Sequence, residues 1–290
     1  MNVFLSWIRF TGCALILSVA AHLSYAQDRP IYRFSPVNQH GLELTASYWN
    51  PIIDYVSKKS GVKLQLKIGR TSADTTAYVL AHEVEFVFSN HLFSPERDNL
   101  GWKVFGRRDA PPIRAQIVVL PNSPIQSLEQ LADKNVAFPG PEALVGYKVV
   151  YAHLLSRNIP VQVLFSGNMD GAFAQLTSGK ASAVGTHTQL ASGWSSRENQ
   201  PLRVLWQSEP FEDLALMAVK TVPAKDLQAV SRAFLEMSGD PEGLKILANA
   251  SRLVKLPKTT GFVLSNGSEY SAYRDFYKNA PFNLRQVQKR

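Results

Sequence analysis

A strand, a turn and a helix meet at Gly140–Gly146, and this junction is the most informative feature of the sequence. Val136–Phe138 is short and apolar, which indicates a buried strand, and a helix is expected from Glu142 to about Arg157. The first backbone N–H groups of a helix have no partner within the helix and point outward. Such a junction can therefore bind an anion or another polar ligand.

The side chains of this turn are unusual for that task. Ala143, Leu144 and Val145 stand where a turn that binds a ligand would carry Ser or Thr hydroxyls. The backbone N–H groups of the same residues remain as donors. The sequence therefore predicts the backbone of a binding site without its usual side-chain donors.

Other side chains could suggest enzyme chemistry, but their spacing does not support it. His82, Glu83, Glu85 and His91 are of types that bind metals, yet no His-x3-His spacing is present. Glu85 lies in a predicted strand, where neighbouring side chains point to opposite faces. The sequence also has no Gly-x-Ser-x-Gly element, phosphate-binding loop or dinucleotide fingerprint. We therefore expect no catalytic residues, no metal, no cofactor and no enzymatic activity.

The first 26 residues are typical of a cleaved secretory signal. Arg9 is their only charged residue, and the apolar run Cys13–Ala21 follows it. Ser24-Tyr25-Ala26 is a small-x-small cleavage site, which makes Gln27 the expected mature start. An uncleaved membrane anchor is the alternative, although the apolar run is shorter than the ~20 residues that a membrane span needs.

The composition of the predicted mature chain fits a periplasmic protein. Its only cysteine, Cys13, would leave with the signal, so disulfides, thiolate metal sites and cysteine nucleophiles are excluded. Without Arg9, 30 Lys and Arg residues face 23 Asp and Glu residues, which gives a net charge of +7. Such a charge can attract anions or an anionic membrane. The charges are scattered rather than gathered in a stripe, which argues against nucleic-acid binding.

Two α/β units are predicted from the alternation of strands and helices. Strands of the first unit are expected at 31–37, 63–68 and 84–88, its helices at 49–60 and 73–81, and a polar loop at 38–47. Strands of the second unit are expected at 113–120, 136–138, 161–165 and 181–184, with helices that start near 127, 142 and 170. Later strands are expected at 203–206 and 214–218, and later helices at 224–237, 241–248 and 269–277. This alternation predicts mainly parallel sheets covered by helices.

The two units are joined by two crossovers, near 111–114 and 207–214. Two lobes connected in this way enclose a cleft, and ligands of such sheets bind beyond the carboxyl ends of the strands. We expect lobe 1 to comprise residues 27–112 with 208–290, and lobe 2 to comprise residues 113–207, after the signal peptide at 1–26.

The order of elements and several motifs resemble the type II periplasmic solute-binding proteins, most closely the phosphate, phosphite and phosphonate type of ABC importers. The segment Asn122–Phe138 is similar to the family's Ser-Pro-Ile-x-Ser-Leu-x-x-Leu…Val-Ala-Phe pattern. Val84–Phe88 and the Asp-Pro-Glu-Gly sequence of Asp240–Gly243 also match. The resemblance covers about residues 31–277 and implies a two-lobed α/β fold with a central ligand cleft.

The resemblance also implies which residues contact the ligand. The family's turn reads Asp-Pro-x-Ser-x-Ser-Gly, so Ala143 and Val145 replace its two serines. Family tyrosines fall at about Ser72 and Ser89, and a family Gly-His falls at Gly167-Asn168. Together with polar residues that lie near strand ends on the cleft side, the expected ligand contacts are Ser72, Thr76, Ser89, Asn90, His91, Ala143, Leu144, Val145, Asn168, Thr186 and His187.

Ordinary structural roles compete with ligand binding at several of these positions. Ser72 and Thr76 could cap a helix, and Asn168 could cap the helix that starts near Asp170. Ser89, Asn90 and His91 could form a plain polar loop after their strand. The sequence leaves both interpretations open.

The missing serines bear on the class of ligand. A charge-assisted hydrogen bond contributes roughly 1.5–3 kcal/mol, so two such losses would weaken oxyanion binding by orders of magnitude. The turn favours a bulkier, less charged or partly apolar ligand over phosphonate or phosphite. The resemblance implies a monomeric periplasmic protein that captures a small ligand and presents it to an ABC permease. A ligand-sensing adaptor for a membrane histidine kinase is the alternative.

Overall fold

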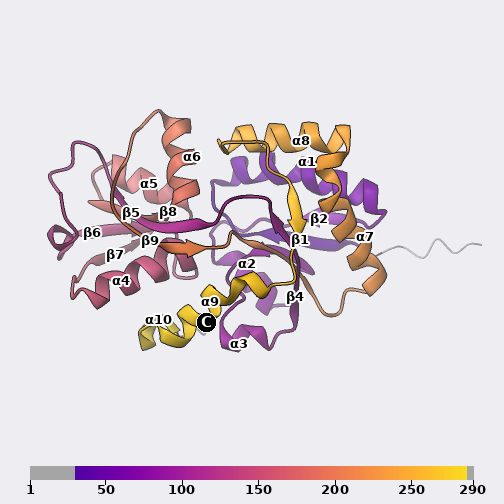
Figure 1. Ribbon diagram of the computed structural model, residues 1–290, viewed down its shortest axis with the longest axis horizontal. Coiled ribbons are helices and arrows are strands. Elements are labelled where there is room, and N and C mark those ends of the chain that lie inside the picture. Colours follow the sequence, from indigo (N-terminus) through magenta and orange to yellow (C-terminus); the bar gives the residue numbers. More distant parts are fainter. Residues whose placement is uncertain (1–29, 286–290) are drawn as a thin grey trace, which may run out of the picture.

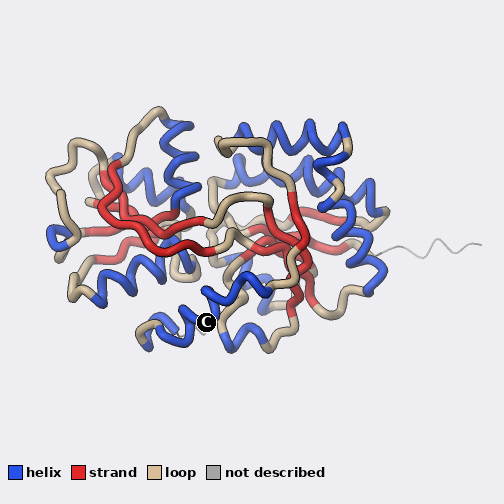
Figure 2. The backbone as a smooth tube through the Cα atoms, viewed as in Figure 1, coloured by secondary structure: helices blue, strands red, loops and turns tan. Residues whose placement is uncertain are grey.

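The computed structural model describes residues 30–285, so the predicted signal peptide lies outside the described part of the chain. The described residues form two mixed β-sheets, each covered by helices on both faces (Figures 1 and 2). The chain passes from the first sheet to the second, and then returns. The predicted two-lobed α/β fold is therefore confirmed.

Lobe 1 is built on a sheet of six strands. The strands are β1 (Tyr32–Pro36), β2 (Leu64–Leu66), β3 (Phe86–Ser89), β4 (Trp102–Arg108), β10 (Ala215–Val219) and β11 (Phe262–Leu264). Their order is β11-β4-β10-β3-β1-β2, and β10 runs antiparallel to both of its neighbours. The helices around this sheet are α1 (Leu42–Ser60), α2 (Asp74–Leu80), α3 (Pro95–Asp98), α7 (Ala224–Leu235) and α8 (Pro241–Leu253).

Lobe 2 is built on a sheet of five strands with the order β7-β6-β8-β5-β9. The strands are β5 (Ile113–Val119), β6 (Asn135–Phe138), β7 (Gln162–Phe165), β8 (Ala183–His187) and β9 (Arg203–Phe211). The helices are a π-helical turn (Leu144–Val149) that continues into α4 (Val150–Ser156), then α5 (Met169–Thr177) and α6 (Thr188–Glu198). The predicted lobe boundary at residue 207 falls inside β9, whose Phe211 pairs with Ile113 of β5.

Helix α1 shows how the core of lobe 1 is made. Trp49, Ile52, Ile53 and Val56 recur at helical spacing, and all four side chains are buried. The helix ends at Gly61, which adopts the left-handed conformation with a φ of 68°. This apolar face packs against the sheet together with residues of α7 and α8.

The predicted polar loop at 38–47 is wrong in its second half, because α1 begins at Leu42. Thr45 and Tyr48 are buried, so tertiary packing extends the helix beyond the strongly apolar stretch. Pro51 consequently lies inside the helix rather than in its first turn. An interior proline removes one helical hydrogen bond, a cost that the buried face of α1 offsets.

Several elements were not predicted from the sequence. They are α3, β4, α6, β11 and the helix Phe282–Arg285. Strand β4 carries Gly106, Arg107 and Arg108, and its pairing with β10 shifts register next to Gly106, so no regular alternation shows in the sequence. Strand β8 was predicted at 181–184 but runs from Ala183 to His187. Thr186 and His187 are therefore part of the strand rather than of the segment after it.

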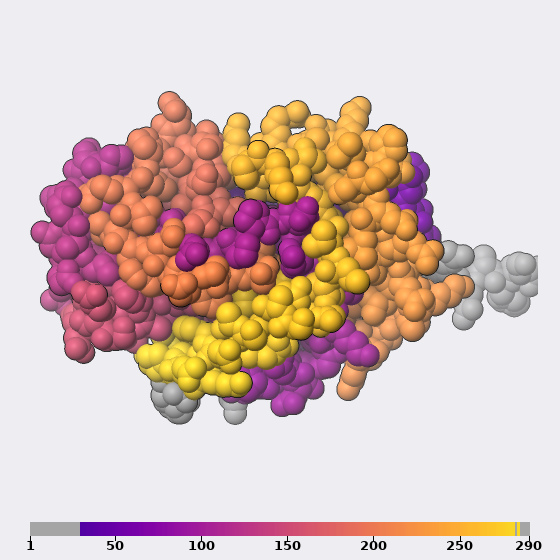
Figure 3. Space-filling view, in the orientation of Figure 1, coloured from indigo at the N-terminus to yellow at the C-terminus, as the bar shows by residue number. Residues whose placement is uncertain are grey.

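The C-terminal helices α9 (Ser271–Asn279) and α10 (Phe282–Arg285) connect the two lobes. Tyr270 stacks on Phe93 of lobe 1, with ring centroids 4.6 Å apart. At the other end of α9, the ring of Tyr277 lies 5.1 Å from the ammonium group of Lys148 in lobe 2. Figure 3 shows this segment, in yellow, along the lower edge of both lobes.

The described helices are unsuited to crossing a membrane. Within residues 30–285, none is both long enough and apolar enough to do so.

Candidate functional site

A small cavity of about 40 Å³ lies between the lobes, where the carboxyl ends of β1, β3 and β6 meet. A space of this size holds at most a few water molecules or a small chemical group, so the structure shows a closed cleft. Both lobes contribute to its wall. The residues that line it are Val37, Asn38, Gln39, Ser72, Asn90, His91, Pro139, Ala143, Leu144, Val145, Gly146, Met169, His187, Leu190 and Leu214.

Most of the residues predicted to contact a ligand line this cavity. They are Ser72, Asn90, His91, Ala143, Leu144, Val145 and His187. Four segments far apart in the sequence supply them, namely the loop after β2, the residues that follow β3, the turn after β6 and the end of β8. As ligand contacts, these residues stay a prediction.

Two further predicted residues, Thr76 and Ser89, form hydrogen bonds with His91. The Thr76 hydroxyl lies 3.0 Å from His91 Nδ1. The Ser89 hydroxyl accepts a hydrogen bond of 3.0 Å from the His91 backbone N–H. Thr76 and Ser89 are not among the lining residues, so their contact with the cavity is indirect.

The remaining two predicted residues have different surroundings. The Asn168 side chain accepts a hydrogen bond of 2.9 Å from Gly171 N–H and so caps α5. The capping role that the sequence left open is therefore present. Thr186 is fully buried in β8, and its hydroxyl has no hydrogen-bond partner within residues 30–285.

Asn38 and Gln39, which lie just beyond the carboxyl end of β1 and line the cavity, were not predicted. The signal was present, because polar residues at the carboxyl end of a parallel strand indicate a ligand site. The same rule singled out Ser89–His91 after β3. Met169, Leu190 and Leu214 were also missed, and as apolar residues they carry no signal in the sequence.

Both histidines at the cavity are uncharged at neutral pH. Burial lowers the pKa of His91 to about 3, against an opposing effect of the Glu142 carboxylate. Burial also lowers the pKa of His187 to about 4, although Asp213 acts in the opposite direction. The two imidazoles can therefore donate or accept hydrogen bonds without adding charge.

Several buried polar atoms at the cavity have no hydrogen-bond partner among the described residues. They are Asn38 Oδ1, Ser72 Oγ and His187 Nδ1. Their residues are between 1% and 5% exposed, so bulk water does not replace a partner. Leaving such a group unpaired costs roughly 1–3 kcal/mol, so these atoms are suited to bind a polar ligand or water.

The turn after β6 presents backbone donors to the same space. The first helical hydrogen bonds run from Tyr147 N–H and Lys148 N–H to the Ala143 carbonyl, at 3.2 and 3.0 Å. The N–H groups of 144–146 come before these bonds, so no carbonyl of the helix accepts from them. The turn opens as a π-helix, a form that often occurs at functional sites.

Polar contacts across the cleft hold the lobes together. The Ser72 N–H donates to the Gly167 carbonyl at 2.7 Å, and Met169 N–H donates to the Gln39 carbonyl at 3.3 Å. The Gly41 N–H donates to the Asp170 carboxylate at 3.0 Å. Each of these bonds joins a residue of lobe 1 to a residue of lobe 2.

Buried ion pairs lie beside the cavity. Arg97 of α3 meets Glu142 of the turn after β6, with 2.6 Å between Nη1 and Oε2. Arg108 and Asp213, which lie where the chain leaves and re-enters lobe 1, are 2.7 Å apart. Each cation is paired with a carboxylate.

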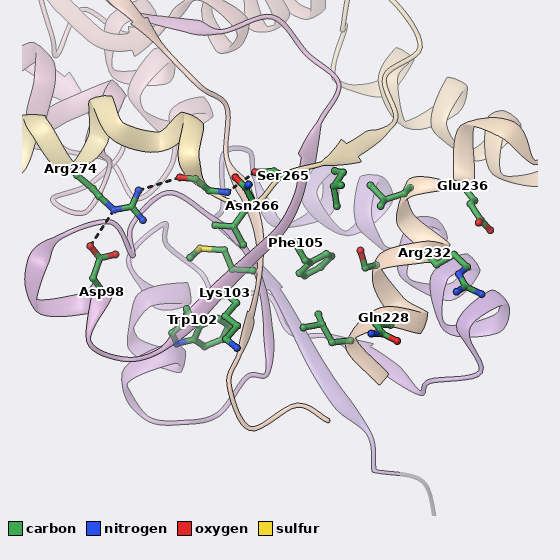
Figure 4. Close-up of a pocket in the computed structure, with 17 residues that line it drawn as sticks. Asp98, Trp102, Lys103, Phe105, Gln228, Arg232, Glu236, Ser265, Asn266 and Arg274 are labelled. Carbon is green, nitrogen blue, oxygen red and sulfur yellow. Dashed lines mark hydrogen bonds and ion pairs between the residues drawn. The ribbon is translucent and has the colours of Figure 1, made fainter. Parts of the chain in front are cut away.

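A larger groove of about 760 Å³ lies outside the cleft, on lobe 1. Figure 4 shows it between β4, α7 and the segment that follows β11. Arg274 and Asp98 form an ion pair at one end, with 3.3 Å between Nε and Oδ2. No residue of lobe 2 lines this groove, so closure of the lobes could not enclose a ligand there.

Comparison with known proteins places the chain in a defined group. A family model described as "ABC transporter, phosphonate, periplasmic substrate-binding protein" matches residues 40–270. Within residues 30–285 the structure contains no group of three or more His, Asp or Glu side chains suited to a metal. No curated protein matches the chain significantly.

Solved structures share the fold at low sequence identity. A binding protein component of an ABC phosphonate transporter from Pseudomonas aeruginosa has a TM-score of 0.70 at 15% identity, over 84% of each chain. PhnD1 from Prochlorococcus marinus in complex with methylphosphonate has a TM-score of 0.73 at 14% identity, over 89% of this chain and 99% of that one. A Xanthomonas citri protein bound to ATP has a TM-score of 0.62 at 15% identity, over 84% of this chain and 95% of that one.

Proposed function

Because the chain belongs to the phosphonate-type periplasmic substrate-binding proteins of ABC transporters, we propose that its interlobe cavity binds a small ligand with little or no net charge. A member of this family captures its substrate in the cleft and presents it to an ABC permease. The closed cleft and the residues that line it are the parts of the chain that would select the ligand.

The chemistry of the lining carries this proposal. Among the described residues that line the cavity there is no Lys, Arg, Asp or Glu, and both histidines are neutral. A phosphonate or phosphite anion would lose its hydration there without meeting an unpaired cation. Moving an ion out of water without a compensating charge costs several kcal/mol.

The available polar groups fit a neutral polar group of the ligand. On the side of lobe 1, the unpaired Asn38 Oδ1 can accept a hydrogen bond and the unpaired Ser72 hydroxyl can donate or accept one, whereas Asn90 Nδ2 already donates to Tyr273. On the side of lobe 2, the backbone N–H groups of 144–146 can donate. We propose that a hydroxyl or amide group of the ligand binds these donors and acceptors.

Apolar side chains complete the wall and fit an aliphatic part of the same ligand. They include Leu144, Val145, Met169, Leu190 and Leu214. A molecule with a polar head and a short apolar body would match both parts of the wall, and the lobes would have to lie further apart than in this structure to hold it.

We propose lobe motion between residues 27–112 with 208–290 and residues 113–207, with cleavage of the signal after Ala26. We also propose that the mature protein is a monomer without enzymatic activity. The comparisons support an ABC permease as partner and lend no support to a histidine kinase.

A thermal-shift screen tests the ligand class. Phosphate, phosphite and methylphosphonate are compared with small neutral amides, alcohols and lactams at equal ionic strength. We expect stabilisation by members of the neutral set and none by the anions. A shift of several degrees with methylphosphonate or phosphite on the unaltered protein would overturn the proposal.

A matched variant restores the family's hydroxyls. The double substitution Ala143→Ser and Val145→Ser returns two donors to the turn without changing its charge. We expect the variant to gain affinity for phosphite and methylphosphonate, measured by isothermal titration calorimetry.

A further inference from the structure

The ion pair between Arg97 and Glu142 joins the two lobes across the closed cleft. Arg97 belongs to α3 of lobe 1, whereas Glu142 belongs to the turn after β6 in lobe 2. Their side chains are only 2% and 8% exposed, and 2.6 Å separate Nη1 from Oε2. Opening the cleft would separate the two charges.

Both groups are charged in this position. Burial acts to raise the pKa of the Glu142 carboxyl, but the hydrogen bond and charge of Arg97 outweigh burial and lower it. Lys148, which lies against the ring of Tyr277, also favours the carboxylate. The closed lobes therefore hold an ionised carboxylate against a guanidinium group.

The pair is directly connected to the cavity wall. Arg97 Nη1 also donates a hydrogen bond of 2.8 Å to the backbone carbonyl of His91, which lines the cavity. Glu142 precedes Ala143, the first lining residue of the turn. An anion in the cleft would therefore meet an arginine whose charge is already matched.

We infer that Glu142 determines ligand specificity by supplying, from the protein itself, the anion that Arg97 binds on closure. The ligand then needs no negative charge to draw the lobes together. This inference rests on the proposed function for the role of the cleft, but it makes a separate statement about the ligand-free protein. That statement is that Glu142 keeps the cleft closed.

Chemical rescue tests the inference. In Glu142→Ala, Arg97 loses its partner and a space the size of a carboxylate is created. We expect formate and acetate to raise the melting temperature of Glu142→Ala in a dose-dependent way, with affinity at least about tenfold higher than for the unaltered protein. Chloride at the same ionic strength should not reproduce the effect.

Small-angle X-ray scattering without ligand gives the second readout. We expect a larger radius of gyration for Glu142→Ala and for the milder Glu142→Gln than for the unaltered protein. The exchanged variant Arg97→Glu with Glu142→Arg should restore the smaller radius. Glu129→Gln is the matched control, because it breaks an exposed ion pair with Arg157 inside lobe 2.

Equal responses to formate and equal radii in the unaltered protein and both Glu142 variants would overturn the inference. Should Glu142→Ala not fold, Glu142→Gln and the exchanged variant decide the question by their radii. Stabilisation of the unaltered protein by methylphosphonate would refute the proposed ligand class. The formate response of Glu142→Ala tests only the role of Glu142.

Discussion

The contacts of Glu142 and of Asp170 across the cleft differ in how completely they depend on closure. At Arg97 and Glu142, each lobe supplies one full charge, and both side chains are buried. At Asp170, the carboxylate is 28% exposed and already pairs with Arg197 of its own lobe at 2.5 Å. Lobe 1 adds only the Gly41 N–H and the His40 ring to Asp170.

This difference has an energetic consequence. Separation of the first pair leaves an unmatched charge in each lobe until water reaches it. Separation of the second contact leaves Asp170 with Arg197. Charge matching across the cleft is therefore concentrated at Glu142.

The largest effect is expected from Glu142→Ala. Removal of one partner of a buried ion pair costs up to about 3–5 kcal/mol while the other charge stays buried, and less once the cleft opens and water reaches Arg97. We expect a decrease of this order in the free energy of unfolding, measured by urea denaturation at pH 7. A loss below about 1 kcal/mol would mean that Arg97 is hydrated in the folded protein.

Acid should weaken the fold through the buried histidines. The pKa of His91 is about 3 in the folded protein, well below its value of 6.5 in a model peptide. Between these values the unfolded chain binds the proton and the folded chain does not, so stability falls as the pH falls. At pH 5 the loss is about 2 kcal/mol for this residue.

Urea denaturation of the unaltered protein and of His91→Gln, each at pH 7 and pH 5, measures this loss. The variant should lose less stability over that interval. Glu142 contributes little there, because a lowered carboxyl pKa changes stability mainly below the usual glutamate pKa of 4.5. An unchanged pH dependence in His91→Gln would show that His91 is protonated in the folded protein.

A smaller effect is expected from Asp170→Asn. The amide oxygen can still accept from Gly41 N–H, and Arg197 is partly hydrated, with 12% of its side chain exposed. We expect a loss of about 1–2 kcal/mol, measured in the same urea series as Glu142→Ala. A loss as large as that of Glu142→Ala would remove the distinction between the two contacts.

The smallest effect is expected from Glu129→Gln. Arg157 and Glu129 are both more than half exposed, so solvent screens their 2.8 Å contact. We expect no measurable change in the free energy of unfolding. A measurable change would show that exposed pairs also stabilise this fold.

The sequence predicted most of the fold because strands and helices of regular periodicity dominate both lobes. It failed where tertiary contacts decide the structure. Helix α1 begins before its apolar repeat because Thr45 and Tyr48 are buried by the rest of lobe 1. Strand β4 was not predicted, because its irregular pairing breaks the alternation of side chains.

The site was predicted in part for a related reason. Polar residues after strand ends have a local signature, which indicated Ser72 and Ser89–His91. The partnership of Arg97 with Glu142 has none, because the residues are 45 positions apart and meet only through the packing of two lobes. In the sequence, Glu142 is one residue of the turn, and no local pattern indicates its pairing with Arg97.

The strand order of lobe 1 sets a constraint on the time course of folding during export. Strand β10 lies between β3 and β4, so the first sheet cannot be completed until Ala215–Val219 has crossed the membrane. Lobe 2 is formed by a continuous stretch that emerges earlier. We therefore expect lobe 2 to fold first. Until β10 arrives, the N-terminal strands remain an incomplete sheet that is exposed to chaperones and proteases.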